Sequence, residues 1–177
     1  MRRVYLAGPE VFLPDAPAIG ARKRALCEAY GFIGLYPLDT EPPARPSRPD
    51  IATAIYRSNL AMMTAADAII ANLSPFRGPS ADSGTVFELG WMIGRGKPGF
   101  GYSTAREGFR ARTVTFLGGA AEQAGRWFDA EGVEIEEFGL HDNLMIDRAL
   151  HEGGVPMLAD FTACLAAARD WFAVRPG

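Results

Sequence analysis

Short apolar runs alternate along this chain with longer segments whose apolar residues recur at helical spacing. Residues 3–7 and 32–36 are apolar runs that end at Gly or Pro, which predicts two strands. Between them, residues 18–30 are rich in Ala, Leu and Arg and predict a helix that Gly31 ends. Residues 68–73 are apolar on both faces of a predicted strand, a pattern typical of parallel sheets.

The middle of the chain continues this alternation after a proline-rich loop. Its prolines, at positions 37, 42, 43, 46 and 49, exclude regular structure there. Asp50 is expected to cap a helix that runs to about Ala66, and a later helix should carry Glu88. Residues 98–102 predict a further strand, and residues 158–172 predict a C-terminal helix.

The place of a fifth strand is open between two segments. Residues 133–138 are the better candidate, although residues 113–117 are also β-like. The alternation predicts a doubly wound, flavodoxin-like three-layer α/β sandwich with a mainly parallel sheet of about five strands. No repeat or linker is visible, so we expect a single domain over residues 1–177. Ligands of such folds bind beyond the carboxyl ends of the strands, in the loops that follow them.

Composition and charge narrow the classes of function. With 48% hydrophobic and 22% charged residues, the 177-residue chain is typical of a globular protein with an ample core. A net charge of −3 and the lack of a Lys/Arg run argue against a nucleic-acid partner. The apolar run after Arg2 and Arg3 is too short for a signal peptide, and no membrane span is visible, which favours a cytoplasmic protein.

No cofactor or metal is predicted. The turn after the first strand lacks the G-x-G-x-x-G pattern, and the chain has no Walker lysine, so dinucleotides and triphosphates are poorly supported. Cys27 and Cys164 lie far apart without clustered histidines, which predicts neither a disulfide framework nor a zinc site.

Two carboxylates six residues apart, Asp82 and Glu88, form the most informative local pattern. Glu88 is expected in the first turn of a helix that is apolar on nearly every face and therefore buried, where an ionised carboxylate is costly unless it is paired. Thr85-x-x-Glu88 also fits a capping box, in which Glu88 would serve only its own helix. That alternative leaves Asp82 unexplained, so an active site is the preferred interpretation.

Six motifs follow one another along the chain. They are Tyr5-Leu-Ala-Gly8 with Phe12, Pro37-Leu-Asp39, Asn59, residues 66–78, residues 82–90 and Asn143-Leu-Met145. Taken together, these motifs resemble nucleoside 2-deoxyribosyltransferases over about the first 145 residues. The resemblance implies an enzyme of nucleotide salvage that moves 2-deoxyribose between nucleobases, with deoxynucleosides and free bases as its substrates.

The resemblance also assigns roles to the catalytic candidates. Glu88 would attack the anomeric carbon and form a covalent glycosyl ester, because a carboxylate beside C1′ can both stabilise and trap an oxocarbenium-like sugar. Tyr5 would donate a hydrogen bond to Glu88 and lower its pKa. Asp82 would bind a sugar hydroxyl or assist the base. Packing for Tyr5 and a favourable charge near a helix start for Asp82 are the structural alternatives.

Other matching residues are expected to bind substrate. Asn143 and Met145 match residues that a neighbouring subunit contributes, which implies a homo-oligomer, either a dimer or a hexamer; a turn-forming Asn is the structural alternative. Some relatives carry Asp where this chain has Asn59. The Asn59 amide would hydrogen-bond the base but cannot titrate, so proton delivery would fall to Asp82 or a water. Asp67 is interpreted as structural.

The loops contribute the remaining candidates. Phe76 and Arg77 would stack on and hydrogen-bond a base, and Phe12 beside Gly8 would do the same, although an exposed loop Arg is often only solvated. Asp39 would contact the sugar or a neighbouring loop, or simply form a turn.

Two other functions remain open from the sequence. A 2-deoxynucleoside 5′-monophosphate N-glycosidase would need a phosphate cradle near the first loop, yet residues 8–20 contain no Ser, Lys or Arg. A non-catalytic nucleoside-binding module would tolerate loss of the nucleophile, whereas Tyr5, Asp82 and Glu88 are all present.

Overall fold

A computed structural model describes residues 1–38 and 47–175. The centre of the fold is a parallel sheet with strand order β2-β1-β3-β4. Its strands are β1 (Arg2–Ala7), β2 (Phe32–Leu35), β3 (Ala68–Asn72) and β4 (Gly99–Tyr102). The predicted doubly wound architecture is confirmed, with four strands rather than five in this sheet.

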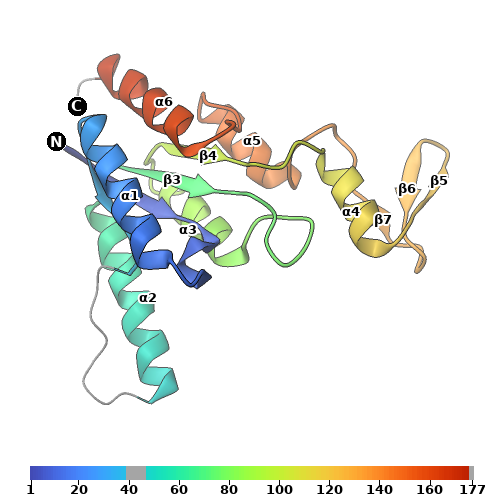
Figure 1. Ribbon diagram of the computed structural model, residues 1–177. Coiled ribbons are helices and arrows are strands. Elements are labelled where there is room, and N and C mark those ends of the chain that lie inside the picture. Colours follow the sequence, from blue (N-terminus) through green and yellow to red (C-terminus); the bar gives the residue numbers. More distant parts are fainter. Residues whose placement is uncertain (39–46, 176–177) are drawn as a thin grey trace.

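Helices cover both faces of the sheet and make three layers (Figure 1). One face carries α1 (Ala16–Ala29) and α6 (Phe161–Ala173), and the other carries α2 (Arg48–Ala65), α3 (Ser83–Ile93) and α5 (Leu144–Glu152). A short 3-10 helix, η1 (Pro9–Phe12), follows β1 directly. None of the helices described is long and apolar enough to cross a bilayer.

The two cores follow from the alternation of side chains along the strands. On β1, Val4 and Leu6 face α1 and α6, whereas Tyr5 and Ala7 face the helices on the other side. All four side chains are buried, as the two-sided apolar pattern predicts for a central parallel strand. This alternation directs Tyr5 to the face that also carries α3.

The predicted fifth strand is wrong. Residues 113–117 belong to α4 (Phe109–Leu117), where the hydroxyl of Thr113 donates to the Phe109 carbonyl 2.8 Å away. The β-branched residues there raise strand propensity, but the local hydrogen bonds of the helix prevail. Residues 133–138 contribute only β7 (Glu134–Ile135), in a separate antiparallel sheet with β5 (Ala121–Gln123) and β6 (Arg126–Phe128).

Helix α4 and this small sheet form an arm that projects from one end of the molecule (Figure 1). The arm comprises residues 105–141. Its side chains are mostly exposed or half-buried, and Ile135 is the one large apolar residue in it that is buried. The arm therefore adds little to the two main cores.

The start of α2 and the burial of α3 also differ from expectation. Helix α2 is capped by Ser47, which forms a reciprocal capping box with Asp50, so Asp50 lies inside the first turn instead of at the cap. Helix α3 is buried on one face only, through Thr85, Leu89 and Met92, while Phe87 is 54% exposed. The apolar sequence of α3 predicted more burial than the structure shows, because some of its apolar side chains face outward.

Helix α6 should stabilise the fold mainly through the side chains that it buries against the sheet. Leu165 is fully buried, so Leu165→Ala is expected to lower the free energy of unfolding by about 2–5 kcal/mol. Leu26 on α1 is 40% exposed, and Leu26→Ala should cost only about 0.5 kcal/mol. Urea denaturation of both variants measures the difference, and equal losses would contradict the packing described here.

Candidate active site

A cavity of about 500 Å³ opens at the carboxyl edge of the sheet, between the turn after β1, helix α2 and the start of α3. Its wall is mainly apolar and includes Val11, Phe12, Leu38, Ile51 and Ile55. Among residues 1–38 and 47–175, the polar side chains that line it are Ser58, Asn59, Asp82, Thr85 and Glu88. A concave, largely apolar site with a few convergent polar groups is typical of a small-molecule pocket.

Glu88 lies at this cavity and is held from two other elements. The phenol of Tyr5 on β1 donates to Oε1 of Glu88 at 2.7 Å, and Nδ2 of Asn59 on α2 donates to the same oxygen at 3.3 Å. Tyr5 is fully buried, so its ring cannot turn away without disturbing the core. Three segments far apart in sequence therefore converge on one carboxylate.

Burial and hydrogen bonding act on Glu88 in opposite directions. Burial raises the pKa of Glu88, the hydrogen bonds from Tyr5 and Asn59 lower it, and the charge of Asp82 raises it, with a net pKa above the ordinary value. The sequence-based expectation of a lowered pKa is right for the contribution of Tyr5 and wrong for the sum, because burial is the larger effect. The pKa of Tyr5 is raised by its burial and by Glu88.

Asp82 is the N-cap of α3. Its Oδ2 accepts hydrogen bonds from the Thr85 amide at 2.9 Å and the Thr85 hydroxyl at 3.0 Å. The capping box proposed for Thr85 and Glu88 is therefore wrong: Thr85 lies within the first turn, and Glu88 lies in the second. Asp82 caps the helix, as the structural alternative expects, and also lines the cavity; its role toward a substrate stays a prediction.

The aromatic candidates form a stack at the rim. Phe12, which lines the cavity, stacks on Phe76 with ring centroids 5.6 Å apart, and the Arg77 guanidinium lies 4.8 Å from the Phe76 centroid and 5.4 Å from that of Phe12. Phe76 and Arg77 are not among the described residues that line the cavity. Both contact Phe12, and a direct contact of either with a base stays a prediction.

Asn143 and Met145 belong to the start of α5. Asn143 is the N-cap of α5, where its Oδ1 accepts from the Met145 amide at 3.0 Å and its Nδ2 donates to Glu136 at 2.8 Å. Met145 is 71% exposed. Neither residue lines the cavity within the described chain, and a role in a neighbouring site stays a prediction.

Three other residues considered in the sequence analysis, Gly8, Asp39 and Asp67, differ in where they lie. Gly8 lines the cavity, whereas Asp39 lies outside the described residues. Asp67 accepts from the Arg3 amide at 2.7 Å and pairs with Arg2 at 3.1 Å, at the opposite edge of the sheet, as its structural interpretation requires. No cluster of three potential metal ligands occurs in residues 1–38 and 47–175.

Sequence reasoning missed the apolar wall on α2. Ile51, Ala54, Ile55 and Ser58 recur at helical spacing and line the cavity, although their pattern reads as an ordinary core face. Only the position of α2, which stands partly clear of the sheet (Figure 1), shows that this face borders a hollow.

A second buried carboxylate, Glu10, was also missed. It lies directly behind Gly8, where it pairs with Lys23 and accepts from Asn72 at 2.8 Å and from the Tyr102 phenol at 3.0 Å. Burial by itself raises the pKa of Glu10, but Lys23 and the hydrogen bonds together hold that pKa below its ordinary value. This group anchors the turn that forms one wall of the cavity.

Known proteins resemble this chain in sequence and in fold. The profile of the nucleoside 2-deoxyribosyltransferase family matches residues 4–145. The solved structure of a 2-deoxyribosyltransferase from Leishmania mexicana is similar with a TM-score of 0.71 and 33% identity, covering 100% of both chains. A conserved protein from Enterococcus faecalis shares the fold, with a TM-score of 0.55 and 18% identity over 97% of this chain and 98% of its own.

An uncharacterised protein from Schizosaccharomyces pombe is 28% identical over 172 residues, which span 90% of this chain and 82% of that relative. The chain has an α/β fold with a cavity at the carboxyl edge of its parallel sheet. Given the match over residues 4–145, the chain belongs to the nucleoside 2-deoxyribosyltransferase family.

The raised pKa of Glu88 predicts a pH-dependent effect on stability. Below about pH 4 the Glu88 carboxyl is protonated in both the folded and the unfolded chain. As the pH rises, the carboxyl ionises first in the unfolded chain, because its pKa is higher in the folded chain, and this favours unfolding. Wild-type stability due to this group is thus lost as pH rises through the folded pKa. Glu88→Gln should therefore unfold at higher urea than wild type at pH 7, with a difference that shrinks toward pH 4. A difference independent of pH would contradict this.

Proposed function

We propose that this protein transfers 2-deoxyribose between nucleobases through a covalent deoxyribosyl ester on Glu88. The observation that carries the proposal is the carboxylate of Glu88 at the cavity, held through one oxygen by Tyr5 and Asn59. Family membership supplies the reaction type. A carboxylate that served only its own helix would not need a buried phenol from the central strand.

In the first step, the ionised Glu88 attacks C1′ of a deoxynucleoside as the N-glycosidic bond breaks. Because Oε1 already accepts the bonds from Tyr5 and Asn59, we assign the attack to Oε2. The electron pair of the broken bond leaves with the base, which takes up a proton or departs as an anion. Tyr5 fixes the carboxylate and stabilises its charged form.

In the second step, a ring nitrogen of another base attacks C1′, the ester bond breaks and Glu88 leaves as a carboxylate. Two successive inversions retain the configuration at C1′. The incoming base loses its N–H proton to Asp82 or to water, because the amide of Asn59 cannot take it. Water attacking the same ester would give hydrolysis, which is the expected side reaction without an acceptor base.

The apolar wall suits the nucleobase. Phe12 offers a ring, already oriented by its stack on Phe76, and Ile51 and Ile55 line the cavity from α2. Stacking and apolar burial discriminate little between bases, so more than one base is expected to enter. Asp82 and Glu88 both line the cavity, and the charge of Asp82 acts on Glu88, so we place the sugar beside these two carboxylates.

The alternatives are less well supported by the described site. No Lys or Arg lines the cavity among the described residues, so a 5′-monophosphate would lack a cationic partner there. A non-catalytic binding module would not need the hydrogen bond from Tyr5 to Glu88. Burial raises the pKa of Tyr5 and the pKa of Glu88, so keeping these two groups together has an energetic cost.

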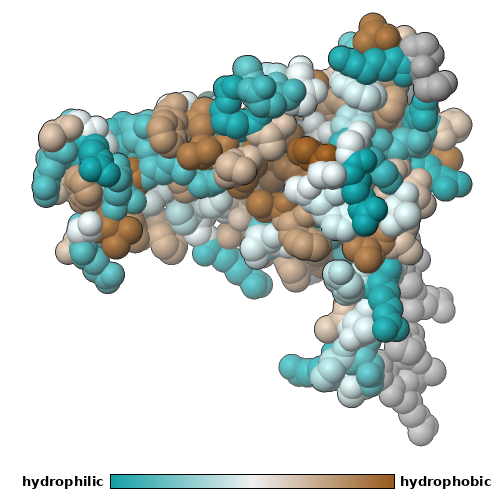
Figure 2. Space-filling model, turned by 180° about the vertical axis from the view of Figure 1, so that it is seen from behind, coloured by the Kyte–Doolittle hydropathy of each residue, from teal (hydrophilic) through white to brown (hydrophobic). Residues whose placement is uncertain are grey.

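The proposal includes a homo-oligomer in which Asn143 and Met145 complete a neighbouring site. Its support is exposed apolar surface: Met145, Phe87 and Phe138 are 71%, 54% and 65% exposed. Hydrophobic residues also gather on the face seen from behind (Figure 2). Apolar patches of this kind are typical of protein interfaces.

Base exchange is the direct test of the nucleophile. Thymidine incubated with adenine should give deoxyadenosine with the wild-type chain, and Glu88→Ala should reduce the rate by at least about a thousandfold because the intermediate cannot form. Peptide mass mapping after reaction with a 2-fluoro-2-deoxynucleoside should place the sugar on Glu88. An adduct on Asp82, or exchange that survives in Glu88→Ala, would contradict the mechanism.

Thymidine monophosphate incubated with water serves as the control for hydrolysis. Release of free thymine from the monophosphate, without formation of deoxyadenosine in the exchange assay, would favour the N-glycosidase. Release of neither product from either substrate would favour the binding module.

Complementation tests the shared site. Glu88→Ala and Asn143→Ala are each expected to be nearly inactive alone. Mixed in equal amounts and allowed to exchange subunits, they should recover about a quarter of wild-type activity if the oligomer is a dimer with two equivalent sites. Failure to recover activity, with mixed oligomers demonstrated by native mass spectrometry, would show that Asn143 serves only its own chain.

A further inference from the structure

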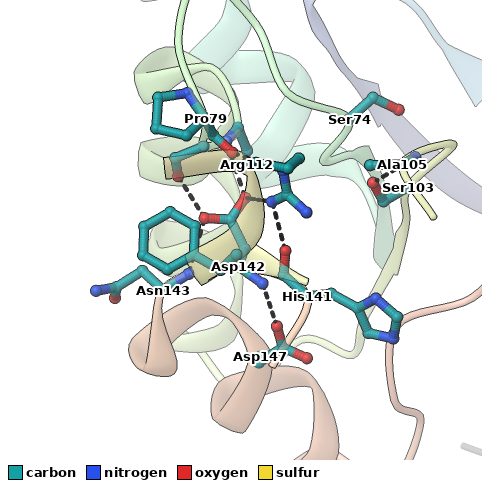
Figure 3. A network of polar contacts seen from close by, with 12 residues as sticks. Ser74, Pro79, Ser103, Ala105, Arg112, His141, Asp142, Asn143 and Asp147 are labelled. Carbon is teal, nitrogen blue, oxygen red and sulfur yellow. Dashed lines mark hydrogen bonds and ion pairs between the residues drawn. The ribbon is translucent and has the colours of Figure 1, made fainter. Parts of the chain in front are cut away.

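A buried carboxylate outside the cavity, Asp142, lies where three chain segments meet (Figure 3). Asp142 is only 1% exposed. Its Oδ1 accepts from the Ser80 hydroxyl and from the Asn143 amide at 2.8 Å, and its Oδ2 accepts from the Ala81 amide at 2.9 Å. Its own amide donates to Asp147 at 2.7 Å.

Arg112 of α4 completes this network. Its Nε donates to the Pro79 carbonyl at 2.9 Å, and its two terminal nitrogens donate to the carbonyls of Glu107 and His141. One of those nitrogens lies 3.9 Å from Oδ2 of Asp142. The guanidinium therefore ties the base of the arm to the loop before α3, as Figure 3 shows.

The location of this network is what connects it to the site. Ala81, which donates to Asp142, is the immediate neighbour of Asp82, the N-cap of α3 and a residue of the cavity wall. On its other side, Asp142 precedes Asn143, the N-cap of α5. One buried carboxylate thus fixes the backbone next to both residues.

We propose that Asp142 and Arg112 are positioning residues that hold Asp82 at the sugar end of the cavity. Neither touches the cavity, so they act through the loop of residues 79–82. This inference rests on the proposed function, in which Asp82 contacts the deoxyribose.

The alternative is a purely structural ion pair. Isolating a carboxylate from water is costly, and a well-packed apolar side chain would often stabilise the fold as well. An apolar residue could not accept the hydrogen bonds from Ser80 and Ala81, which orient the loop ahead of Asp82. The network fixes the position of Asp82, and a carboxylate that binds a sugar must be held in a defined position.

Kinetics of base exchange distinguish the two interpretations. Asp142→Asn places an amide donor where acceptors are needed and is expected to raise KM for the donor deoxynucleoside about tenfold, with a smaller change in kcat. Arg112→Gln should act in the same direction. Arg169→Gln, which removes an exposed pair with Asp170 on the far face, is the control and should leave both constants unchanged.

A double-mutant cycle shows whether the effect passes through Asp82. If it does, Asp142→Asn should raise KM much less in a chain that already carries Asp82→Asn, because the two changes damage the same contact. Independent, multiplicative effects would overturn the proposal, since a general loss of stability does not depend on Asp82. If Asp142→Asn does not fold, Ser80→Ala removes a single hydrogen bond and should give a smaller change with the same dependence.

Amide hydrogen exchange provides a readout that does not depend on activity. In Asp142→Asn, the amides of Ala81 and Thr85 should exchange about tenfold faster or more, while those of α1 stay as slow as in wild type. Unchanged exchange at Thr85 would overturn the proposal. A wild-type chain that fails to exchange bases would instead contradict the proposed function, and hydrogen exchange would still decide whether Asp142 holds the loop.

Discussion

The hydrogen bond from Tyr5 to Glu88 is the constraint on which the candidate site depends. It joins the central strand to a helix 83 residues further along the chain and places an ionisable carboxylate where water is scarce. Burial alone would favour the neutral acid, and the phenol offsets part of that preference. Burial is nevertheless the larger effect, and the pKa of Glu88 stays above its ordinary value.

The surrounding structure holds Tyr5, Glu88 and the cavity walls in place. Strand order β2-β1-β3-β4 puts β1 in the interior of the sheet, so Tyr5 is enclosed on every side and its position is fixed. Behind the turn that follows β1, Glu10 and Lys23 anchor the wall at Gly8. On the other side, Asp142 anchors the loop before α3. Buried ionic groups thus flank the cavity on two sides, where position matters more than net stability.

Much of the fold was predictable because the signal was local. The apolar run at β3 and the alternation at β1 are recorded directly in residue order, and both strands formed where expected. The errors fall where local and tertiary preferences disagree. Residues 113–117 carry β-branched side chains yet form a helix on the arm, and Thr85 fits a capping motif although Asp82 is the cap.

The sequence by itself determined the α/β class, the central parallel strands and the chemical identity of Glu88, Tyr5 and Asp82, because periodicity and residue type need no knowledge of distant neighbours. The tertiary structure decided the rest. Only folding shows that Asn59 joins Tyr5 on one oxygen of Glu88, that Ile51 and Ile55 face a cavity, and that Asp142 lies beside the loop of Asp82. These are contacts between residues far apart along the chain, and no local pattern specifies which segments will meet.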